Sequence, residues 1–178
     1  MNVSGQLRMT VYASLLAALT AAGAYIAIPI GPVPVVLQNM FIFLSGILLG
    51  SRWGLASVGV YLLAGACGLP VFAGGVGGIG RFIGPTGGYL LGYLPAVYVI
   101  GLISEKTKPV AVFDVMAMLC GGVIIYACGA SWLKMITGMD WGKALAVGMN
   151  PVFLAGDAVK ISAAVAVAKA LRPVIYRA

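Results

Sequence analysis

Long apolar runs, broken by short groups of glycine, proline and charged residues, occupy almost the whole chain. A run of about 20 apolar residues is long enough to cross the hydrocarbon core of a bilayer. The pattern predicts six membrane-spanning helices, at roughly residues 8–28, 36–51, 54–70, 85–103, 109–133 and 151–170. The second and third are short for a bilayer core of about 30 Å, and the connection Ser51-Arg52-Trp53 between them is very tight. Residues 1–178 are therefore expected to form one all-α membrane domain, with no soluble domain.

The composition indicates an integral membrane protein and limits the kinds of catalytic or metal site that it could contain. The chain is 62% hydrophobic and 8% charged, whereas soluble domains carry about a quarter charged residues. It has four acidic residues and no histidine, and Cys67, Cys120 and Cys128 lack the C-x-x-C spacing of a metal site. No metal and no cofactor are expected. The net charge of +7 comes from scattered basic residues, which a membrane explains better than a nucleic acid does.

The distribution of the basic residues predicts cytoplasmic N- and C-termini, because cytoplasmic loops are enriched in lysine and arginine. With the N-terminus inside, the outer side receives Arg81, Lys134 and Lys143. The inner side receives a larger set: Arg8, Arg52, Lys106, Lys108, Arg172 and Arg177. Trp53 would then mark the inner interface, and Trp132 and Trp141 the outer one.

Three segments would face outward: residues 28–38, 71–85 and 134–150. The first contains several prolines, which predict a stiff, extended cap. The second contains Gly75-Val-Gly-Gly-Ile-Gly80, which matches the G-x-G-x-x-G fingerprint of dinucleotide-binding sites. Such a site needs a preceding strand and an acid about 20 residues later, and neither is present here. Glycine instead lets the backbone approach a ligand closely, although a flexible surface loop would use it too.

The last predicted span carries an ionisable pair. Asn150-Pro151 is typical of a helix start, and Asp157 and Lys160 follow on one face. Ionisable residues inside a membrane span indicate function by default, although the pair could also neutralise itself and only fix helix packing. A carboxylate accepts and an ammonium donates, so together they suit a neutral urea or amide group.

Four motifs in register resemble the BioY family, which supplies the biotin-binding membrane subunit, the S component, of energy-coupling-factor (ECF) transporters. They are Gly31-Pro-Val-Pro34 with Leu37-Gln38, Gly68-Leu-Pro-Val-Phe-Ala-Gly-Gly75, Gly84-Pro-Thr-Gly-Gly-Tyr-Leu90 and Pro151-x-x-x-x-Gly-Asp-x-x-Lys160. The resemblance covers most of the chain. It departs from the family at Arg81, in a part of the glycine-rich loop that is usually apolar or small.

The resemblance implies six transmembrane helices, a pocket near the outer face, and high-affinity binding and uptake of biotin across a bacterial or archaeal cytoplasmic membrane. The ureido ring of biotin would meet Asp157 and Lys160, and the loop containing Gly75 and Gly78 would close over the ligand. Arg81 could meet the valerate carboxylate, or could be a free loop arginine. Weaker candidates for polar contacts are Gln38, Thr86 and Tyr89.

The first helix carries Ala13, Ala17 and Ala21 at four-residue spacing, with Ala18 and Ala22 beside them. Small residues at this spacing let helices pack closely, within the chain or against a partner. In the resembled family an alanine face on this helix docks onto the transmembrane coupling protein, which connects to a pair of ATPases. The chain has no usable ATP site of its own, so energy for concentrative transport would come from these partners. The family also leaves open a biotin transporter that works alone.

Two other classes of function are compatible with a small membrane protein. A channel would need a polar path across several spans, and the remaining intramembrane polar residues are few. A membrane enzyme would need an acid–base pair or an activated nucleophile, and none is present without histidine and with no second acid near Asp157. The chain is therefore not expected to be an enzyme.

Overall fold

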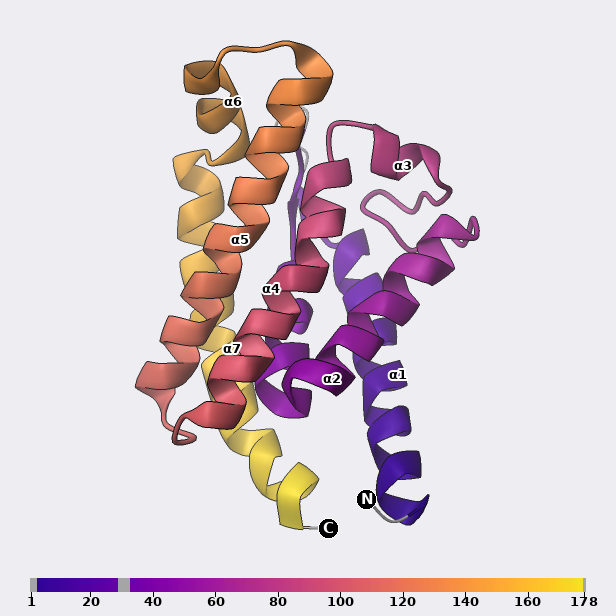
Figure 1. Ribbon diagram of the computed structural model, residues 1–178, viewed down its shortest axis with the longest axis vertical. Coiled ribbons are helices and arrows are strands. Elements are labelled where there is room, and N and C mark those ends of the chain that lie inside the picture. The colour runs from indigo at the N-terminus through magenta and orange to yellow at the C-terminus, as the bar shows by residue number, and fades with distance from the viewer. Residues whose placement is uncertain (1–2, 29–32, 178) are drawn as a thin grey trace.

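The computed structural model describes residues 3–28 and 33–177, and this part of the chain is helical apart from one short hairpin and the connecting loops (Figure 1). Five of its segments are long and apolar enough to cross a membrane, the last of them running from Trp141 to Ile175. The helices are α1 (Val3–Tyr25), α2 (Gln38–Ala66), α3 (Gly80–Ile83), α4 (Gly87–Lys106), α5 (Ala111–Thr137), α6 (Trp141–Gly148) and α7 (Pro151–Arg177).

Large apolar side chains are exposed along the long helices, where a soluble protein would carry polar ones. Leu63, Val123 and Val159 have 66%, 66% and 70% of their surface exposed. Extended apolar surface of this kind marks contact with another apolar phase. Together with the length of the helices, it supports a multi-pass membrane protein.

Helix α2 lies at the centre of the bundle and is bent into two arms. In its most apolar window 72% of the residues are buried, against 33% in α1. The bend is at Gly50, whose φ of 77° and ψ of −173° lie outside the helical region. The predicted spans 36–51 and 54–70 correspond to the two arms, which meet at this bend, so one of the five long apolar segments of the described chain contains two of the six predicted spans. Hydropathy alone separates two apolar runs but does not determine how the backbone joins them.

A carboxylate from α4 completes the bend. Glu105 Oε1 accepts hydrogen bonds from the backbone N–H of Ser51, at 2.7 Å, and from its hydroxyl, at 3.0 Å. The first N–H groups of a helix have no partner within the helix, so the second arm gains an acceptor that it would otherwise lack. A β-carbon at Gly50 would lie 2.3 Å from the same Oε1 atom, and its positive φ also favours glycine.

Helices α4 and α5 pack closely because glycines lie where they touch. A β-carbon added at Gly88 would lie 2.2 Å from Cβ of Trp132, and one at Gly129 would lie 2.2 Å from the ring of Tyr89. Small residues let membrane helices approach to backbone contact. This close packing determines where the α4 and α5 side chains described below enter the interior.

The segment after α1 forms a two-stranded antiparallel hairpin. Strand β1 (Ala27–Ile28) pairs with β2 (Val35–Val36), with Ala27 opposite Val36. An extended proline-rich segment was expected here, and Pro34 lies within the described part of it. Pro29, Gly31 and Pro32 lie outside the described residues.

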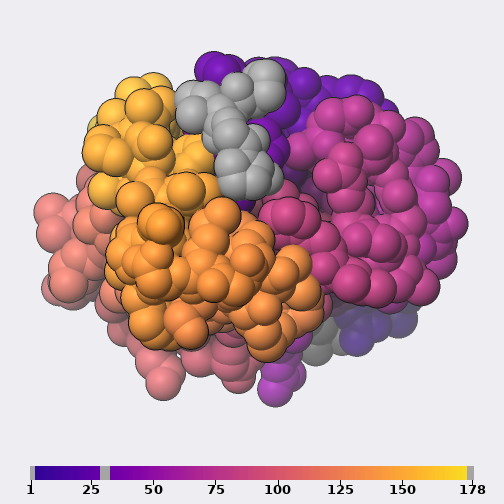
Figure 2. Space-filling model, turned by 90° about the horizontal axis from the view of Figure 1, so that it is seen from above, coloured from indigo at the N-terminus to yellow at the C-terminus, as the bar shows by residue number. Residues whose placement is uncertain are grey.

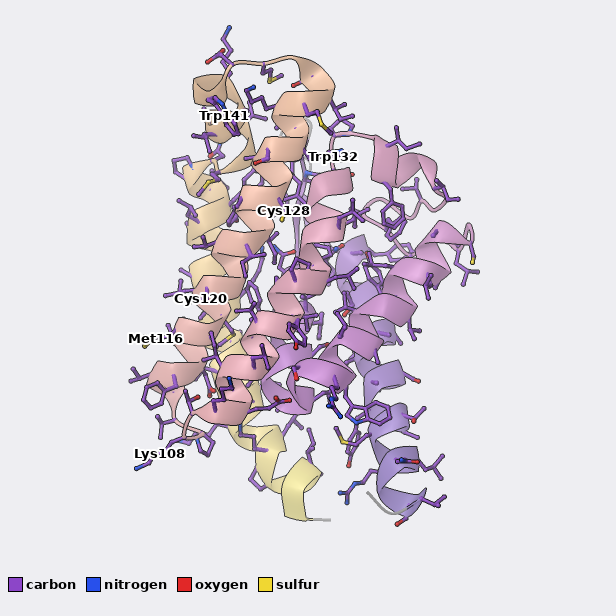
Figure 3. All side chains as sticks on the ribbon, viewed as in Figure 1. Lys108, Met116, Cys120, Cys128, Trp132 and Trp141 are labelled. Carbon is purple, nitrogen blue, oxygen red and sulfur yellow. The ribbon has the colours of Figure 1, made fainter. Side chains whose placement is uncertain are left out.

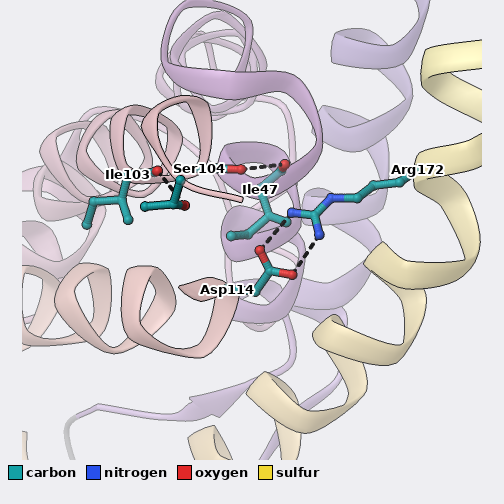
Figure 4. Close-up of polar contacts among 6 residues, drawn as sticks. Ile47, Ile103, Ser104, Asp114 and Arg172 are labelled. Atoms are coloured by element: carbon teal, nitrogen blue, oxygen red, sulfur yellow. Dashed lines mark hydrogen bonds and ion pairs between the residues drawn. The ribbon is translucent and has the colours of Figure 1, made fainter. Parts of the chain in front are cut away.

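The two ends of the chain lie at one end of the molecule, and α3 and α6 lie towards the other (Figure 1). Near the chain ends a bidentate ion pair joins α5 to α7: the Arg172 guanidinium donates to both oxygens of Asp114, at 2.7 and 2.8 Å (Figure 4). Asp114 is 4% exposed. Ser104 of α4 donates to the carbonyl of Ile47 nearby, at 3.1 Å, so polar contacts connect both α2 with α4 and α5 with α7 at this end.

The tryptophans of the second half of the chain lie at the end opposite to the chain ends. Trp132 and Trp141 lie towards α6, whereas Lys108 lies at the far end of the bundle (Figure 3). The indole N–H of Trp132 donates to the carbonyl of Gly84 at 3.0 Å. The ammonium of Lys134 lies 4.9 Å from the ring centroid of Trp141, within the range of a cation–π contact.

Candidate functional site

A cavity of about 780 Å³, counting the open space at its mouth, lies among the ends of the helices near α3 and α6. Figure 2 looks down on this end, with α7 and the α5–α6 region on one side and the loop that precedes α4 on the other. The lining of the cavity combines apolar walls with a few placed polar groups, as small-molecule sites do. Its apolar walls include Val33, Val36, Phe72, Leu90, Ile125 and Phe153.

The ionisable pair predicted on the last span lines this cavity. Asn150 starts α7 as expected, with its side-chain oxygen accepting the backbone N–H of Val152 at 3.0 Å. Asp157 then lies six residues beyond Pro151, or about 9 Å along the helix. Lys160 Nζ lies 2.8 Å from Asp157 Oδ1, and the side chains of Lys160 and Asp157 are 8% and 10% exposed, respectively. Two opposite charges are thus paired in the interior while both border the cavity.

Asp157 has a second partner, which the sequence did not reveal. The hydroxyl of Tyr126, on α5, donates to Asp157 Oδ2 at 2.6 Å. Tyr126 is 8% exposed and also lines the cavity. Buried tyrosine hydroxyls usually find a partner, so a tyrosine inside an apolar span was the available signal. The identity of that partner depends on how α5 and α7 pack and could not be predicted.

Four weaker candidates from the sequence also line the cavity: Gln38, Arg81, Thr86 and Tyr89. Gln38 is 2% exposed, and its amide oxygen lies 3.4 Å from the hydroxyl of Tyr61, a long and weak hydrogen bond. The hydroxyl of Tyr89 is committed to α6, because it donates to the carbonyl of Gly148 at 3.0 Å. Arg81 is exposed at the cavity edge.

Asn39 and Tyr93 are cavity residues that the sequence did not indicate. The hydroxyl of Tyr93 donates to Asn39 Oδ1 at 3.0 Å, and both side chains border the cavity. With its oxygen occupied, Asn39 has its amide N–H groups as the remaining donors. This wall therefore adds polar groups from α2 and α4 to those from α5 and α7.

Gly75 and Gly78 are absent from the lining of the cavity, and the expected closure of their loop over a ligand stays a prediction. Both have positive φ, 69° and 99°, in the loop between α2 and α3. The N–H of Gly78 donates to the carbonyl of Gly65 at 2.7 Å, which ties the loop to the end of α2. The glycines therefore shape the loop, and it is Phe72 and Ala73 from the same loop that reach the cavity wall.

The small residues of α1 divide between two faces. Ala13 and Ala17 are each 6% exposed and belong to the chain's own hydrophobic core, while Ala21 is half-buried against that core. This burial agrees with packing of α1 within the chain. Ala13 and Ala17 are therefore not accessible to a partner. The exposed small residues of this helix include Ser14, Ala18 and Ala22, on the opposite face.

Comparison with known proteins gives consistent matches over nearly the whole chain. Residues 1–177 match the model of the BioY family. A protein named biotin transporter BioY from Thermotoga maritima is 42% identical over 166 residues, which cover 93% of this chain and 96% of that protein. A probable biotin transporter BioY from Pyrococcus horikoshii is 40% identical, covering 89% of this chain and 93% of the relative.

A solved structure has the same fold. The crystal structure of the S component for biotin from an ECF-type ABC transporter superposes with a TM-score of 0.90, at 32% sequence identity. The superposition covers 97% of this chain and 94% of the other.

Proposed function

Because the chain belongs to the BioY family, as its match over residues 1–177 shows, we propose that it binds biotin and takes it up across the cell membrane as the substrate-capture subunit of an ECF transporter. The family resemblance expected from the four motifs is confirmed. The family consists of transporter components and not of enzymes. The names of the relatives and of the similar crystal structure support the choice of substrate.

The observation that carries this proposal is the buried pair of Asp157 and Lys160 on the cavity wall. The ureido ring of biotin is neutral and presents two N–H donors and one carbonyl acceptor. A carboxylate is an acceptor and an ammonium is a donor, so the two groups complement both edges of that ring. Charge-assisted hydrogen bonds are stronger than neutral ones, and their shielding from water adds to the effect.

The rest of biotin would occupy the remaining cavity. The fused thioether ring and the alkyl tail are apolar, and Phe72, Ile125 and Phe153 offer matching walls. Arg81 would meet the carboxylate at the exposed edge, since its guanidinium is the only cation in the loop of residues 71–85. Gln38, Thr86 and Tyr89 would contribute further polar contacts, and Gly75 and Gly78 would act by shaping the loop above.

We place the cavity towards the outer face of a bacterial or archaeal cytoplasmic membrane, with both chain ends in the cytoplasm. The chain ends lie together at the end of the bundle that carries Lys108, and Trp141 lies at the other end (Figures 1 and 3). Lysine is enriched on cytoplasmic sides, and tryptophan at membrane interfaces. With the two arms of α2 counted separately, this arrangement corresponds to the six-span topology.

The energy for uptake would come from partner subunits: a transmembrane coupling protein and its ATPases. The similar crystal structure is that of an S component from an ECF-type ABC transporter, which supports this over a transporter that works alone. We place the docking surface on the exposed face of α1, which combines Ser14, Ala18 and Ala22 with the exposed apolar side chains of Val11 and Leu15. Small residues on such a face allow a partner helix to approach closely.

A binding titration on the purified, detergent-solubilised chain tests the proposal. Biotin and desthiobiotin, which share the ureido ring, should bind saturably at one site per chain. Riboflavin and thiamine, which lack that ring, should not bind. Equal binding of all four compounds, or no binding of biotin, would refute the proposed substrate. Ion conductance of the same preparation in a planar bilayer would favour the channel instead.

A further inference from the structure

We propose that Tyr126 is a positioning residue for substrate recognition, which fixes the carboxylate of Asp157 so that its free lone pairs point at the ligand. This inference rests on the proposed function and adds a residue to it. Tyr126 acts through Asp157, and its contribution is the direction in which that acceptor points.

Each carboxylate oxygen of Asp157 accepts a hydrogen bond from a different side chain. Lys160 donates to Oδ1 at 2.8 Å, from one turn further along the same helix. Tyr126 donates to Oδ2 at 2.6 Å, from a different helix. Asp157, Lys160 and Tyr126 are 7%, 7% and 8% exposed, so water has little access to compete for these contacts. The O–H···O distance is in the short range of strong, charge-assisted hydrogen bonds.

Two donors restrict the carboxylate far more than one does. The terminal torsion of an aspartate is broad, so a carboxylate held at a single oxygen can still turn. Lys160 belongs to the same helix and cannot by itself prevent that rotation. Because Tyr126 comes from α5, it holds the second oxygen from another direction and so fixes the plane of the group.

The carboxylate of Asp157 keeps acceptor positions that are free for a ligand. An ionised carboxylate has about four acceptor positions, and Lys160 and Tyr126 occupy two of them. Asp157 and Tyr126 both border the cavity, so the remaining positions can receive N–H donors from there. An acceptor that is already oriented spares the ligand the cost of ordering it, which strengthens binding.

Tyr126 is itself held in place by its neighbours. Its ring packs edge-on against Tyr89, with centroids 6.5 Å apart and an interplanar angle of 88°. The hydroxyl of Tyr89 is in turn fixed by the carbonyl of Gly148. The donor that orients Asp157 is therefore on a packed aromatic ring rather than on a mobile side chain, as a positioning role requires.

Replacement Tyr126→Phe keeps the ring and removes only the donor. The affinity for biotin should fall by about 10- to 100-fold, as expected for loss of a hydrogen bond to a charged group. Tyr98→Phe is the matched control, because Tyr98 lies on α4 with 43% of its surface exposed and is not a cavity residue. The control should bind biotin as the unsubstituted chain does.

A second pair of variants tests whether Tyr126 positions Asp157 or only supports the fold. This pair is informative even if the Tyr126→Phe variant does not fold. Replacing Tyr126 by 4-aminophenylalanine restores an N–H donor, whereas 4-fluorophenylalanine has a similar shape and no donor. Biotin affinity should recover at least in part with the amino group and stay low with fluorine, in preparations of both variants that remain folded in detergent.

The possible failures are distinguishable. Equal affinities for the amino and fluoro variants, or an unchanged affinity in Tyr126→Phe, would overturn the role of Tyr126 while leaving the proposed function intact. Absence of biotin binding by the unsubstituted chain would overturn the proposed function, and this inference with it.

Discussion

The carboxylate of Glu105, near the end of α4, lies 2.7 Å from the backbone nitrogen of Ser51, at the start of the second arm of α2. The same carboxylate accepts the hydroxyl of Ser51. A side chain distant in sequence thus supplies the acceptor that helices usually obtain from their own N-cap residue. The bend at Gly50 and the packing of α4 on α2 therefore stabilise each other.

Removal of this cap should destabilise the protein without affecting the cavity. For Glu105→Ala we expect a loss of about 1 kcal/mol, the usual cost of losing a helix cap. Thermal unfolding in detergent measures it, and Lys106→Ala, the next residue of the same helix end, is the control. An unfolding temperature equal to that of the control would show that the Glu105 contact contributes nothing.

Substitution at the bend should cost more than the loss of the cap. In Gly50→Ala the new β-carbon would lie 2.3 Å from Glu105 Oε1, and the residue must also keep φ at +77°. We expect destabilisation of more than about 1 kcal/mol, since alanine is strained at positive φ. Gly59→Ala is the matched control in the same helix, because nothing lies within 4 Å of its added β-carbon. Equal stabilities of the two variants would refute the importance of the bend.

Each member of the buried pair should be necessary for binding. Asp157→Asn and Lys160→Ala should weaken biotin binding by at least about tenfold, because each removes a charge-assisted hydrogen bond to the ligand. The chain contains a matched control pair with the same i,i+3 spacing: Asp140 and Lys143, whose side chains are 63% and 78% exposed. Asp140→Asn and Lys143→Ala should bind biotin normally. If both pairs behaved alike in the titration, the site would be misassigned.

The ion pair of Asp114 and Arg172 should contribute to stability only. Breaking a largely buried pair strands one charge, so Arg172→Ala should cost about 3 kcal/mol. The double replacement Asp114→Val with Arg172→Met removes both charges and should recover much of that loss. Equilibrium unfolding compares the three proteins. A double variant no more stable than Arg172→Ala would contradict the prediction, and so would a biotin affinity that fell in a folded variant.

The two faces of α1 should respond differently to a bulky residue. Ala18→Trp, on the exposed face, should spare folding and biotin binding but impair co-purification with the coupling protein. Ala17→Trp should destabilise the chain itself, because Ala17 is 6% exposed within the core. Val123→Trp, on the exposed surface of α5, is the control for bulk alone. Intact co-purification of Ala18→Trp would move the docking surface away from this face.

Local sequence was sufficient to locate most helices and the charged pair. Asn150-Pro151 marks a helix start by the conformational preferences of those two residues, and the i,i+3 spacing of Asp157 and Lys160 places them on one face whatever the rest of the fold does. The four-motif resemblance then indicated the family, from which the proposed substrate follows. These features depend on residues close together in the chain or on a pattern in fixed order.

What the sequence did not reveal depends on contacts between distant segments. Tyr126 and Asp157 are 31 positions apart, and their hydrogen bond exists only because α5 packs beside α7. Ala13 and Ala17 look the same as Ala18 in a pattern of small residues, and only the position of α2 and the rest of the core decides which of them are covered. The bend at Gly50 likewise joins two apolar runs that hydropathy separates.

The bend in α2 also affects how the molecule can be recognised from outside. Because α2 turns back at Gly50 without a loop, the end that carries the chain ends has one interhelical connection in the described chain, residues 107–110. An antibody fragment directed at this end would have to recognise several helix tips at once, so its epitope would be conformational and its binding would report an intact bundle. Fragments against the opposite end could instead recognise continuous segments, such as residues 67–79.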